Sequence, residues 1–253
     1  MHRSARQAAI MKTLGMHGSC TVSDLSGELA VSDETIRRDI KIMANKGLVE
    51  RVHGGAMLPD LFREADFQKR LNHNAEAKRA IARTVAAQVR NGESLMLDTG
   101  STTAYVARAL TEHTDLLVVT NCTDIARTLA SRNRNQVYMA GGQFRADDGA
   151  ILGASAIRFI NQFRVRTAIL SMAAIHPEFG FMDFHLREAE FSQAVMGQAQ
   201  RVIVAADTTK FTVQAPVKVC GFAAIDTLVT DRPPPPPAAR HLAESNVAVL
   251  LAE

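Results

Sequence analysis

From Ala75 to the end of the chain, short apolar runs of strand length alternate with amphipathic stretches of helix length. This alternation predicts parallel strands, because each helix carries the chain back to the end of the sheet where the next strand begins. Helices then cover both faces of the sheet, so this part is predicted to be an α/β domain with a mostly parallel sheet. The strands are expected at Ser94–Asp98, Leu116–Thr120, Gln136–Ala140, Thr167–Met172, Arg201–Ala206, Thr227–Thr230 and Val247–Leu250, and the helices at Glu76–Val89, Thr102–Leu110, Thr123–Ser131, Ser155–Gln162, Arg187–Ala199 and Pro237–Glu244.

The composition is that of a globular chain with an aliphatic core. Of the 253 residues, 47% are hydrophobic and 22% charged, which excludes a disordered or collagen-like chain, and only 5% are aromatic. The net charge of +3 permits a nucleic-acid partner without arguing for one. Three distant cysteines (Cys20, Cys122 and Cys220) predict neither a disulfide framework nor a zinc site, so no metal or cofactor is expected. No apolar run approaches membrane-spanning length, and a cytoplasmic protein with no membrane partner is expected.

The first 47 residues fit three short helices, at Ser4–Met16, Ser23–Ala30 and Asp33–Lys46. Ser23 and Ser32 are predicted to cap the second and third helices, because a serine hydroxyl can accept a hydrogen bond from a free backbone N–H. The link between these two helices is very short. Two short helices joined in this way predict a helix-turn-helix.

The third helix has two chemically different faces. Ile36, Ile40 and Met43 form a narrow apolar stripe, and polar residues take the other side: Glu34, Arg38, Lys41 and Asn45 on the opposite face, with Thr35 and Arg37 on its flanks. Such a helix can enter the major groove of DNA, where arginine pairs with guanine and lysine reaches phosphate. The alternative is an ordinary solvated face, on which the basic residues are balanced by Glu34 and Asp39.

A predicted hairpin follows the third helix. Leu48–Arg51 and Val52–Leu58 bracket Gly54 and Gly55, a dipeptide suited to the positive backbone angles of a tight turn. Arg51 and His53 would project from one face of the first strand, as a wing that touches backbone phosphates requires.

These patterns divide the chain into three parts. Residues 1–58 are predicted to be a winged helix-turn-helix domain, and residues 75–253 the α/β domain. The segment 59–74 between them is polar and charged with few apolar residues, so it is predicted to be a linker that is helical in part.

A candidate phosphate site follows the first strand of the α/β domain. Small hydroxyl residues and a glycine at the start of a helix direct N–H groups and hydroxyls at one spot, where the helix dipole favours an anion, although capping alone also favours such residues there. The carboxyl ends of parallel strands gather at one edge of the sheet. Lys210 would supply a cation, and the carboxylates would accept hydrogen bonds from sugar hydroxyls. The candidate residues are Asp98, Thr99, Gly100, Ser101, Thr102, Thr103, Thr120, Asn121, Gly141, Gly142, Asp183, Glu188, Asp207 and Lys210.

The N-terminal motifs resemble the winged helix-turn-helix of the DeoR family of bacterial transcriptional repressors. The resemblance lies in Val31–Ile40 and Gly47–Ala56, and Thr21–Arg38 corresponds to the family's helix-turn-helix proper. It implies that Thr35, Arg37 and Arg38 face DNA. Together with the pattern of the helices and wing, the expected DNA-binding residues are Thr21, Ser23, Ser32, Glu34, Thr35, Arg37, Arg38, Lys41, Arg51 and His53.

The C-terminal part is similar to the effector domain of the same family, whose fold is related to sugar-phosphate isomerases. The matching stretches are Glu76 with Lys78–Ala82, Asp98–Thr103, Thr120–Asn121, Gly141–Gly142, Gly153 and Asp207–Lys210, while Ser171–Ile175 and His176–Glu178 depart from the family pattern. The resemblance implies a repressor of a carbohydrate or polyol catabolic operon, relieved by a phosphorylated sugar or polyol such as glycerol 3-phosphate. It also implies binding to double-stranded operator DNA. Because one recognition helix reads only a few base pairs, a symmetric partner is needed, and a homodimer or tetramer is expected.

Two other functions stay open at this point. A sugar-phosphate isomerase with an appended DNA-binding domain could use Asp183, Glu188 or Asp207 as a general base. An activator would differ from a repressor only in where its operator lies, which the chain does not encode. The resemblance favours the repressor, for which no catalytic residue is expected.

Overall fold

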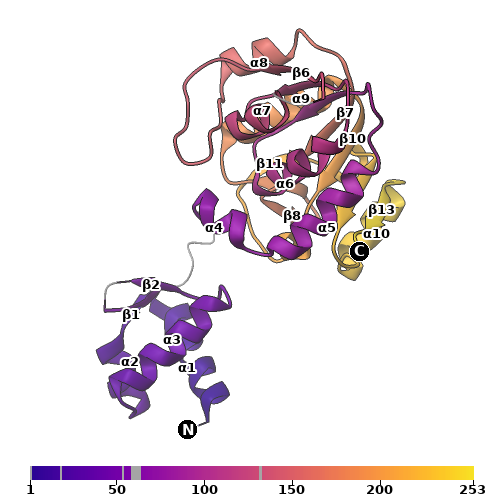
Figure 1. Ribbon diagram of the computed structural model, residues 1–253. Coiled ribbons are helices and arrows are strands. Elements are labelled where there is room, and N and C mark those ends of the chain that lie inside the picture. The colour runs from indigo at the N-terminus through magenta and orange to yellow at the C-terminus, as the bar shows by residue number, and fades with distance from the viewer. Residues whose placement is uncertain (1, 18, 53, 58–63, 131–132) are drawn as a thin grey trace. The chain divides into compact units, whose positions relative to one another are not determined.

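The computed structural model describes residues 2–17, 19–52, 54–57, 64–130 and 133–253 (Figure 1). The chain divides into two compact units, Met1–Arg63 and Glu64–Glu253. Each has a hydrophobic core of its own. Over the described ranges, no helix is both long and apolar enough to cross a membrane.

The first unit is a three-helix winged helix-turn-helix. Its helices are α1 (Arg3–His17), α2 (Val22–Leu29) and α3 (Asp33–Asn45), and its strands β1 (Ser19–Thr21), β2 (Glu50–Val52) and β3 (Gly55–Met57) form an antiparallel sheet in the order β1-β3-β2. The core joins all three helices through buried side chains, among them Ile10, Leu14, Leu25, Ile36, Ile40 and Met43. The three predicted helices and the hairpin are confirmed, and β1 is an element that the sequence did not predict.

The two predicted helix caps have different outcomes. Ser32 does cap α3, because its hydroxyl accepts the N–H of Thr35 at 3.3 Å. For α2 the prediction of Ser23 is wrong. Thr21 is the cap, since its hydroxyl accepts the N–H of Asp24 at 3.0 Å while the Asp24 carboxylate accepts the N–H of Thr21, a reciprocal pair that leaves Ser23 inside the helix.

The two glycines of the wing are needed for different reasons. Gly54 has a φ of +77°, as a tight hairpin requires. Gly55 lies in β3 opposite β1, where a Cβ would stand 2.2 Å from the carbonyl oxygen of Cys20. The second glycine is therefore required by the close approach of two strands and not by a positive φ. The neighbouring His53 lies outside the described residues.

The second unit contains the predicted parallel sheet. Its seven strands are β4 (Ser94–Leu97), β5 (Leu117–Thr120), β6 (Gln136–Met139), β7 (Val165–Leu170), β10 (Ala199–Ala205), β12 (Thr227–Thr230) and β13 (Ala248–Leu251). They are all parallel, in the order β13-β12-β10-β7-β4-β5-β6. Every predicted strand is confirmed, with ends that differ by up to two residues.

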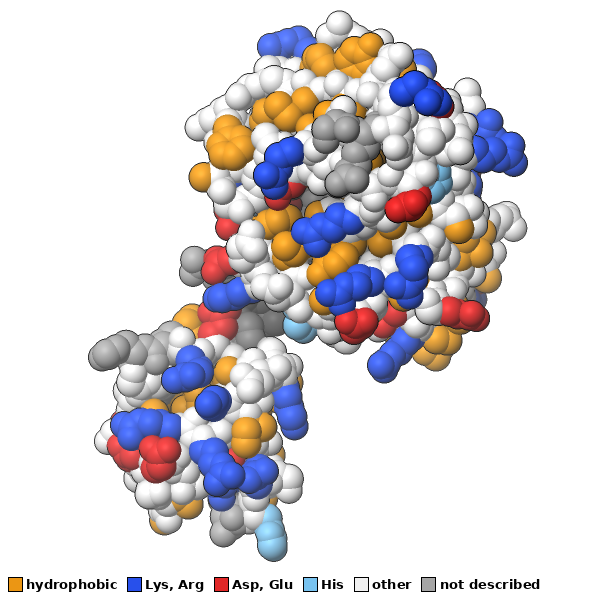
Figure 2. All heavy atoms as spheres, in the orientation of Figure 1, with side chains coloured by type: hydrophobic (Ala, Val, Ile, Leu, Met, Phe, Trp, Pro, Cys, Tyr) orange, Lys and Arg blue, Asp and Glu red, His pale blue; other side chains and the backbone are white. Residues whose placement is uncertain are grey.

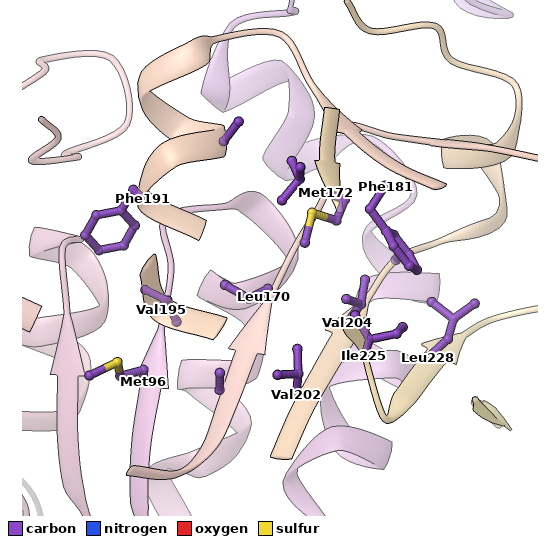
Figure 3. Packing of buried hydrophobic residues seen from close by; sticks show 14 of the residues in the cluster. Met96, Leu170, Met172, Phe181, Phe191, Val195, Val202, Val204, Ile225 and Leu228 are labelled. Carbon is purple, nitrogen blue, oxygen red and sulfur yellow. The ribbon is translucent and has the colours of Figure 1, made fainter. Parts of the chain in front are cut away.

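Helices cover both faces of this sheet. They are α5 (Ala75–Ala86), α6 (Ser101–Ala109), α7 (Thr123–Ala130), α8 (Ala154–Ile160), α9 (Leu186–Gly197) and α10 (Pro236–Glu244), with short 3-10 turns at η1 (Leu110–Glu112), η2 (Thr208–Phe211) and η3 (Phe222–Ala224). Alternate residues of each strand enter opposite cores: Leu95 and Leu97 pack with α5, α6 and α7, and Met96 packs on the other face with Phe191 and Val195 of α9 (Figure 3).

A small sheet, and the packing of the segment before residue 75, were not predicted for the second unit. Strands β8 (Ala174–His176), β9 (Gly180–Asp183) and β11 (Val217–Cys220) form a small antiparallel sheet. The short helix α4 (Phe67–Asn72) lies within the predicted linker 59–74, yet Phe67 is only 2% exposed and α4 packs on α6. The second unit therefore begins at Glu64 and not at residue 75, where the sequence placed the start of the α/β domain, because Glu64–Asn74 fold as part of this unit.

Replacing Gly55 by alanine is expected to destabilise the first unit by about 1–3 kcal/mol, because the new methyl group overlaps the Cys20 carbonyl. The matched control is Gly27→Ala in α2, where a Cβ meets nothing within 4 Å and alanine should stabilise the helix by about 0.5–1 kcal/mol. Denaturant unfolding followed by circular dichroism at helical wavelengths checks both, since the chain has no tryptophan and both tyrosines lie in the second unit. Equal stability of the two variants would contradict the close approach of β1 and β3.

Candidate functional site

The exposed face of α3 is the first candidate site. Ile36, Ile40 and Met43 are buried in the core of the first unit, as predicted. Glu34, Arg37, Arg38 and Lys41 are exposed on the remaining surface, and Thr35 is half-buried. Figure 2 shows basic side chains on the surface of this unit.

Ion pairs within the unit separate the basic residues of α3 into two kinds. Asp39, which the solvated-face alternative used to balance the basic residues, is 1% exposed and pairs with Arg6 of α1. Arg37 pairs with Asp33 at 3.7 Å, one helical turn away. Among the residues that the structure describes, no carboxylate lies within 4.0 Å of Arg38 or Lys41, so their charges face solvent without a partner. Of the two acidic residues that the solvated-face alternative used, Asp39 therefore does not balance Arg38 or Lys41.

The other predicted DNA-binding residues lie around α3. Ser32 and Thr35 share a hydroxyl–hydroxyl hydrogen bond of 2.9 Å at the start of the helix. Thr21 and Ser23 are exposed at the start of α2, and the Thr21 hydroxyl is engaged in the cap. Arg51 is exposed on β2, the first strand of the wing.

The second candidate site is a polar cavity in the second unit, at the carboxyl ends of β4, β7 and β10. These three strands are neighbours in the sheet, which brings together the loops that follow them. Asp183 reaches the cavity from the end of β9, Glu188 from the first turn of α9 and Lys210 from η2. The lining residues are Glu64, Arg70, Thr99, Ser101, Thr102, Ser171, Met172, Ala173, Asp183, Glu188 and Lys210.

The start of α6 lies at this cavity, where Ser101 and Thr102 of its first turn line the wall. Gly100 precedes the helix and has no side chain to cap it, so the first-turn N–H groups have no side-chain acceptor from the cap residue. Its φ of −175° suits any residue, but a Cβ would stand 1.9 Å from the Ser171 hydroxyl. Gly100 thus lets Ser171, directly after β7, approach the helix start closely, and it leaves that start without a side-chain cap.

Four of the predicted residues beside the cavity hold the local backbone. The Asp98 carboxylate accepts the N–H of Ser171 at 3.1 Å and so joins the ends of β4 and β7. The Thr103 hydroxyl donates to the carbonyl oxygens of Asp98 and Gly100. Asp207 caps η2 by accepting the N–H of Thr209 at 3.1 Å. These three side chains and Gly100 are not among the cavity's lining residues, and this position makes Asp207 a poor general base for a ligand bound there.

The predicted residues after β5 and β6 also lie outside the cavity lining. Asn121 is next to it, since its side-chain oxygen accepts from the Thr99 hydroxyl at 3.0 Å, while Thr120 caps the following turn. Gly141 and Gly142 follow β6, which is two strands away from β4. The order of the strands, which the sequence does not specify, accounts for this separation, because each strand adds about 4.8 Å.

Five lining residues were not predicted: Glu64, Arg70, Ser171, Met172 and Ala173. The last three belong to the stretch that departs from the family pattern. Glu64 and Arg70 belong to the predicted linker, where Phe67 was the apolar signal that this segment packs against a domain.

Burial and like charges determine the ionisation of the cavity. Burial, and then the nearby Glu188 and Glu64 carboxylates, raise the pKa of Asp183 from 3.8 to about 8. Burial also raises the pKa of Glu64, although Arg70 opposes the shift. Burial lowers the pKa of Lys210 in spite of Asp207. A protonated Asp183 can donate as well as accept a hydrogen bond, which suits a ligand hydroxyl.

Glu64, His185 and Glu188 bring potential metal-ligand atoms within 4.8 Å of one another. Both carboxylates already have cationic partners: Arg70 pairs with Glu64 at 2.7 Å, and Arg145 pairs with Glu188. A cavity that also holds Lys210 favours an anionic ligand over a metal ion.

The two units and their sites define a winged helix-turn-helix protein that carries an α/β domain with a polar, charged cavity. The chain belongs to the DeoR family. The family model of the DeoR-like helix-turn-helix domain matches residues 6–61, and the model of the DeoR C terminal sensor domain matches residues 73–232.

Relatives of similar length extend the match to nearly the whole chain. The chain is 34% identical to the glycerol-3-phosphate regulon repressor of Escherichia coli (strain K12) over 235 residues, 93% of each chain. It is 31% identical to the HTH-type transcriptional repressor CsqR of the same organism over 246 residues, 97% of this chain and 94% of that one. Among solved structures, a D-ribose-5-phosphate isomerase in complex with phospho-erythronic acid aligns with a TM-score of 0.41 at 16% identity over 54% of each chain.

The pKa of Asp183 generates a prediction about stability. Between about pH 4 and pH 8 the folded chain keeps a proton on Asp183 that the unfolded chain loses, so the free energy of unfolding should fall as the pH rises through this range. Asp183→Asn removes this proton uptake, and its melting temperature should fall less between about pH 5 and pH 8 than that of the wild type. Asp66→Asn, an exposed carboxylate, is the control and should follow the wild type. Parallel curves for all three proteins would place the Asp183 pKa in its ordinary range.

Proposed function

We propose that this chain is a transcriptional repressor that binds operator DNA through the α3 face and the wing, and that a phosphorylated sugar or polyol bound in the polar cavity relieves the repression. Relatives that match over nine-tenths of their length are named as repressors, among them one named for the glycerol-3-phosphate regulon. Glycerol 3-phosphate is therefore the first effector to test. Such a protein acts where the chromosome is, which agrees with the expected cytoplasmic location.

The DNA-binding part of this proposal is supported mainly by Arg38 and Lys41 on α3, neither of which has a carboxylate partner among the described residues. Their charges are not consumed by ion pairs within the described residues, whereas Asp39 on the same helix is buried against Arg6. Guanidinium groups held on a helix of this motif can pair with guanine, and ammonium groups can bind phosphate. Thr35 and Arg37 flank the same face, and we assign Thr21, Ser23, Ser32, Glu34, Arg51 and His53 to the surrounding contacts.

The effector part rests on the chemistry of the cavity. The start of α6 and Lys210 offer N–H donors and a cation for a phosphate, and Thr99, Ser101 and Thr102 add hydroxyls. Asp183 and Glu188 stand at the same cavity and suit the hydroxyl groups of a polyol or sugar. Differential affinity of the effector for one state of the chain would lower operator affinity.

A repressor with one short recognition helix needs a symmetric partner to read a sufficiently long site. We therefore propose a homodimer or tetramer, with two half-sites in the operator. The isomerase alternative is not favoured, because the relatives that cover nearly the whole chain carry the names of repressors and not of enzymes.

Arg38→Ala is expected to weaken binding to the operator by about 1–3 kcal/mol, because a base contact is lost. The measurement is a band-shift titration with fragments that tile the DNA upstream of the chain's own gene, starting from the fragment that the wild type binds. Lys12→Ala, which removes an exposed charge from α1, is the control and should change the affinity little. An unaltered affinity of Arg38→Ala would return this residue to the solvated-face alternative.

Lys210→Ala is expected to bind the same fragment as the wild type, but its release should need about tenfold more glycerol 3-phosphate, because one charge-assisted contact to the phosphate is lost. Lys218→Ala, an exposed lysine on β11, should respond like the wild type. If the wild type is released by no phosphorylated sugar or polyol, the induction scheme is wrong. If Lys210→Ala responds normally, Lys210 is not part of the site.

A further inference from the structure

The polar cavity has a wall formed by the first residues of the second unit. Glu64 is the residue at which this unit begins, and Arg70 lies in α4 directly after it. Both side chains line the cavity with Thr99 and Lys210, and they are only 12% and 16% exposed. The Arg70 Nη1 atom lies 2.7 Å from the Glu64 Oε1 atom, so the two residues form an ion pair at the cavity.

The backbone of this wall is anchored independently of that ion pair. Phe67 is buried, and its N–H donates to the Asp147 carboxylate at 3.3 Å. Lys78 of α5, itself 2% exposed, donates from Nζ to the carbonyl oxygens of Arg70 and His73 at the end of α4. The Arg70 side chain is thus presented to the cavity from a fixed point.

Part of the Arg70 guanidinium has no hydrogen-bond partner among the described residues and can donate to a ligand. Its Nε donates to the Ala65 carbonyl oxygen at 2.9 Å, and Nη1 faces Glu64. No other hydrogen bond from this guanidinium is found among the residues that the structure describes. A planar guanidinium with free N–H groups beside a lysine is well suited to a phosphate, which arginine binds with two parallel hydrogen bonds.

Resting on the proposed function, we propose that Arg70 is a phosphate-binding residue of this site. When the effector binds, its phosphate replaces the Glu64 carboxylate as the partner of the Arg70 guanidinium. A phosphate dianion competes with the single carboxylate of Glu64 for the same donors. Burial raises the pKa of Glu64, and the nearby Glu188 adds to the shift while Arg70 opposes it, so this carboxylate is a weak competitor for the guanidinium. The exchange of partners involves Glu64, the first residue of the second unit, and Arg70 of α4.

A purely structural ion pair makes a different prediction from a pair in competition with the ligand. If the pair only holds α4 in place, losing either partner should weaken ligand binding in the same direction. If phosphate and Glu64 compete, removing Arg70 weakens binding and removing the charge of Glu64 strengthens it. The two explanations therefore differ in the sign of one measurement.

The test is calorimetric titration of the full chain with glycerol 3-phosphate. Arg70→Ala should bind about tenfold more weakly than the wild type. Glu64→Gln, which keeps the size of the side chain, should bind about twofold or more tightly. Lys69→Ala removes the neighbouring lysine of α4, whose side chain is 77% exposed, and should bind glycerol 3-phosphate as the wild type does. Weaker binding by Glu64→Gln, or unchanged binding by Arg70→Ala, overturns the proposal.

Hydrogen exchange of the same chain separates this proposal from the proposed function. With glycerol 3-phosphate bound, the amides of Ser101–Ala104 and those of α4 should both exchange more slowly than without it. Protection at Ser101–Ala104 alone would leave the effector site standing and overturn the role of Arg70. Protection at neither place, with no heat of binding by the wild type, would overturn the proposed effector site and this inference with it.

Discussion

The burial of the seven-stranded sheet on both faces is the constraint on which the second unit depends. Leu95 and Leu97 enter one core and Met96 the other, so neither face of the central strands has room for polar chemistry. Polar groups can gather only where the strands end. Because β10, β7 and β4 are adjacent, the loops that follow them meet at one edge, and the Asp98–Ser171 hydrogen bond joins two of these strand ends directly.

At both candidate sites, some of the charged side chains form ion pairs within the protein and others do not. In the first unit, Asp39 is buried against Arg6 and Arg37 is paired with Asp33, whereas Arg38 and Lys41 have no carboxylate partner among the described residues. In the second unit, Arg145 pairs with Glu188 and Arg70 with Glu64. At the same cavity, burial raises the pKa of Asp183 and lowers the pKa of Lys210, so it disfavours the charged form of each. These groups are the reason for which we propose a phosphorylated polyol or sugar as the ligand: the cations suit its phosphate and the carboxyl groups suit its hydroxyls.

Local patterns predicted most of the architecture. The period of the apolar residues identified all seven parallel strands and the helices between them, because a strand buried on both faces must be apolar throughout. Two predictions failed for different reasons. Thr21 caps α2 in place of Ser23 because Asp24, three residues further on, completes a reciprocal pair, which is a local signal. Glu64–Asn74 fold onto the second unit because Phe67 is buried there, which is a tertiary contact.

The sequence by itself determined the two kinds of domain, the recognition helix with its apolar and basic faces, and the hydroxyl-rich loop Thr99–Thr102 at a helix start. These are local properties, set by residues a few positions apart. The tertiary structure alone decided which strand ends share a cavity: it brought Glu64, Arg70, Asp183 and Lys210 together and left Gly141, Gly142 and Asp207 outside the lining. The reason is that strand order and the packing of α4 depend on contacts between distant residues, which no local period encodes.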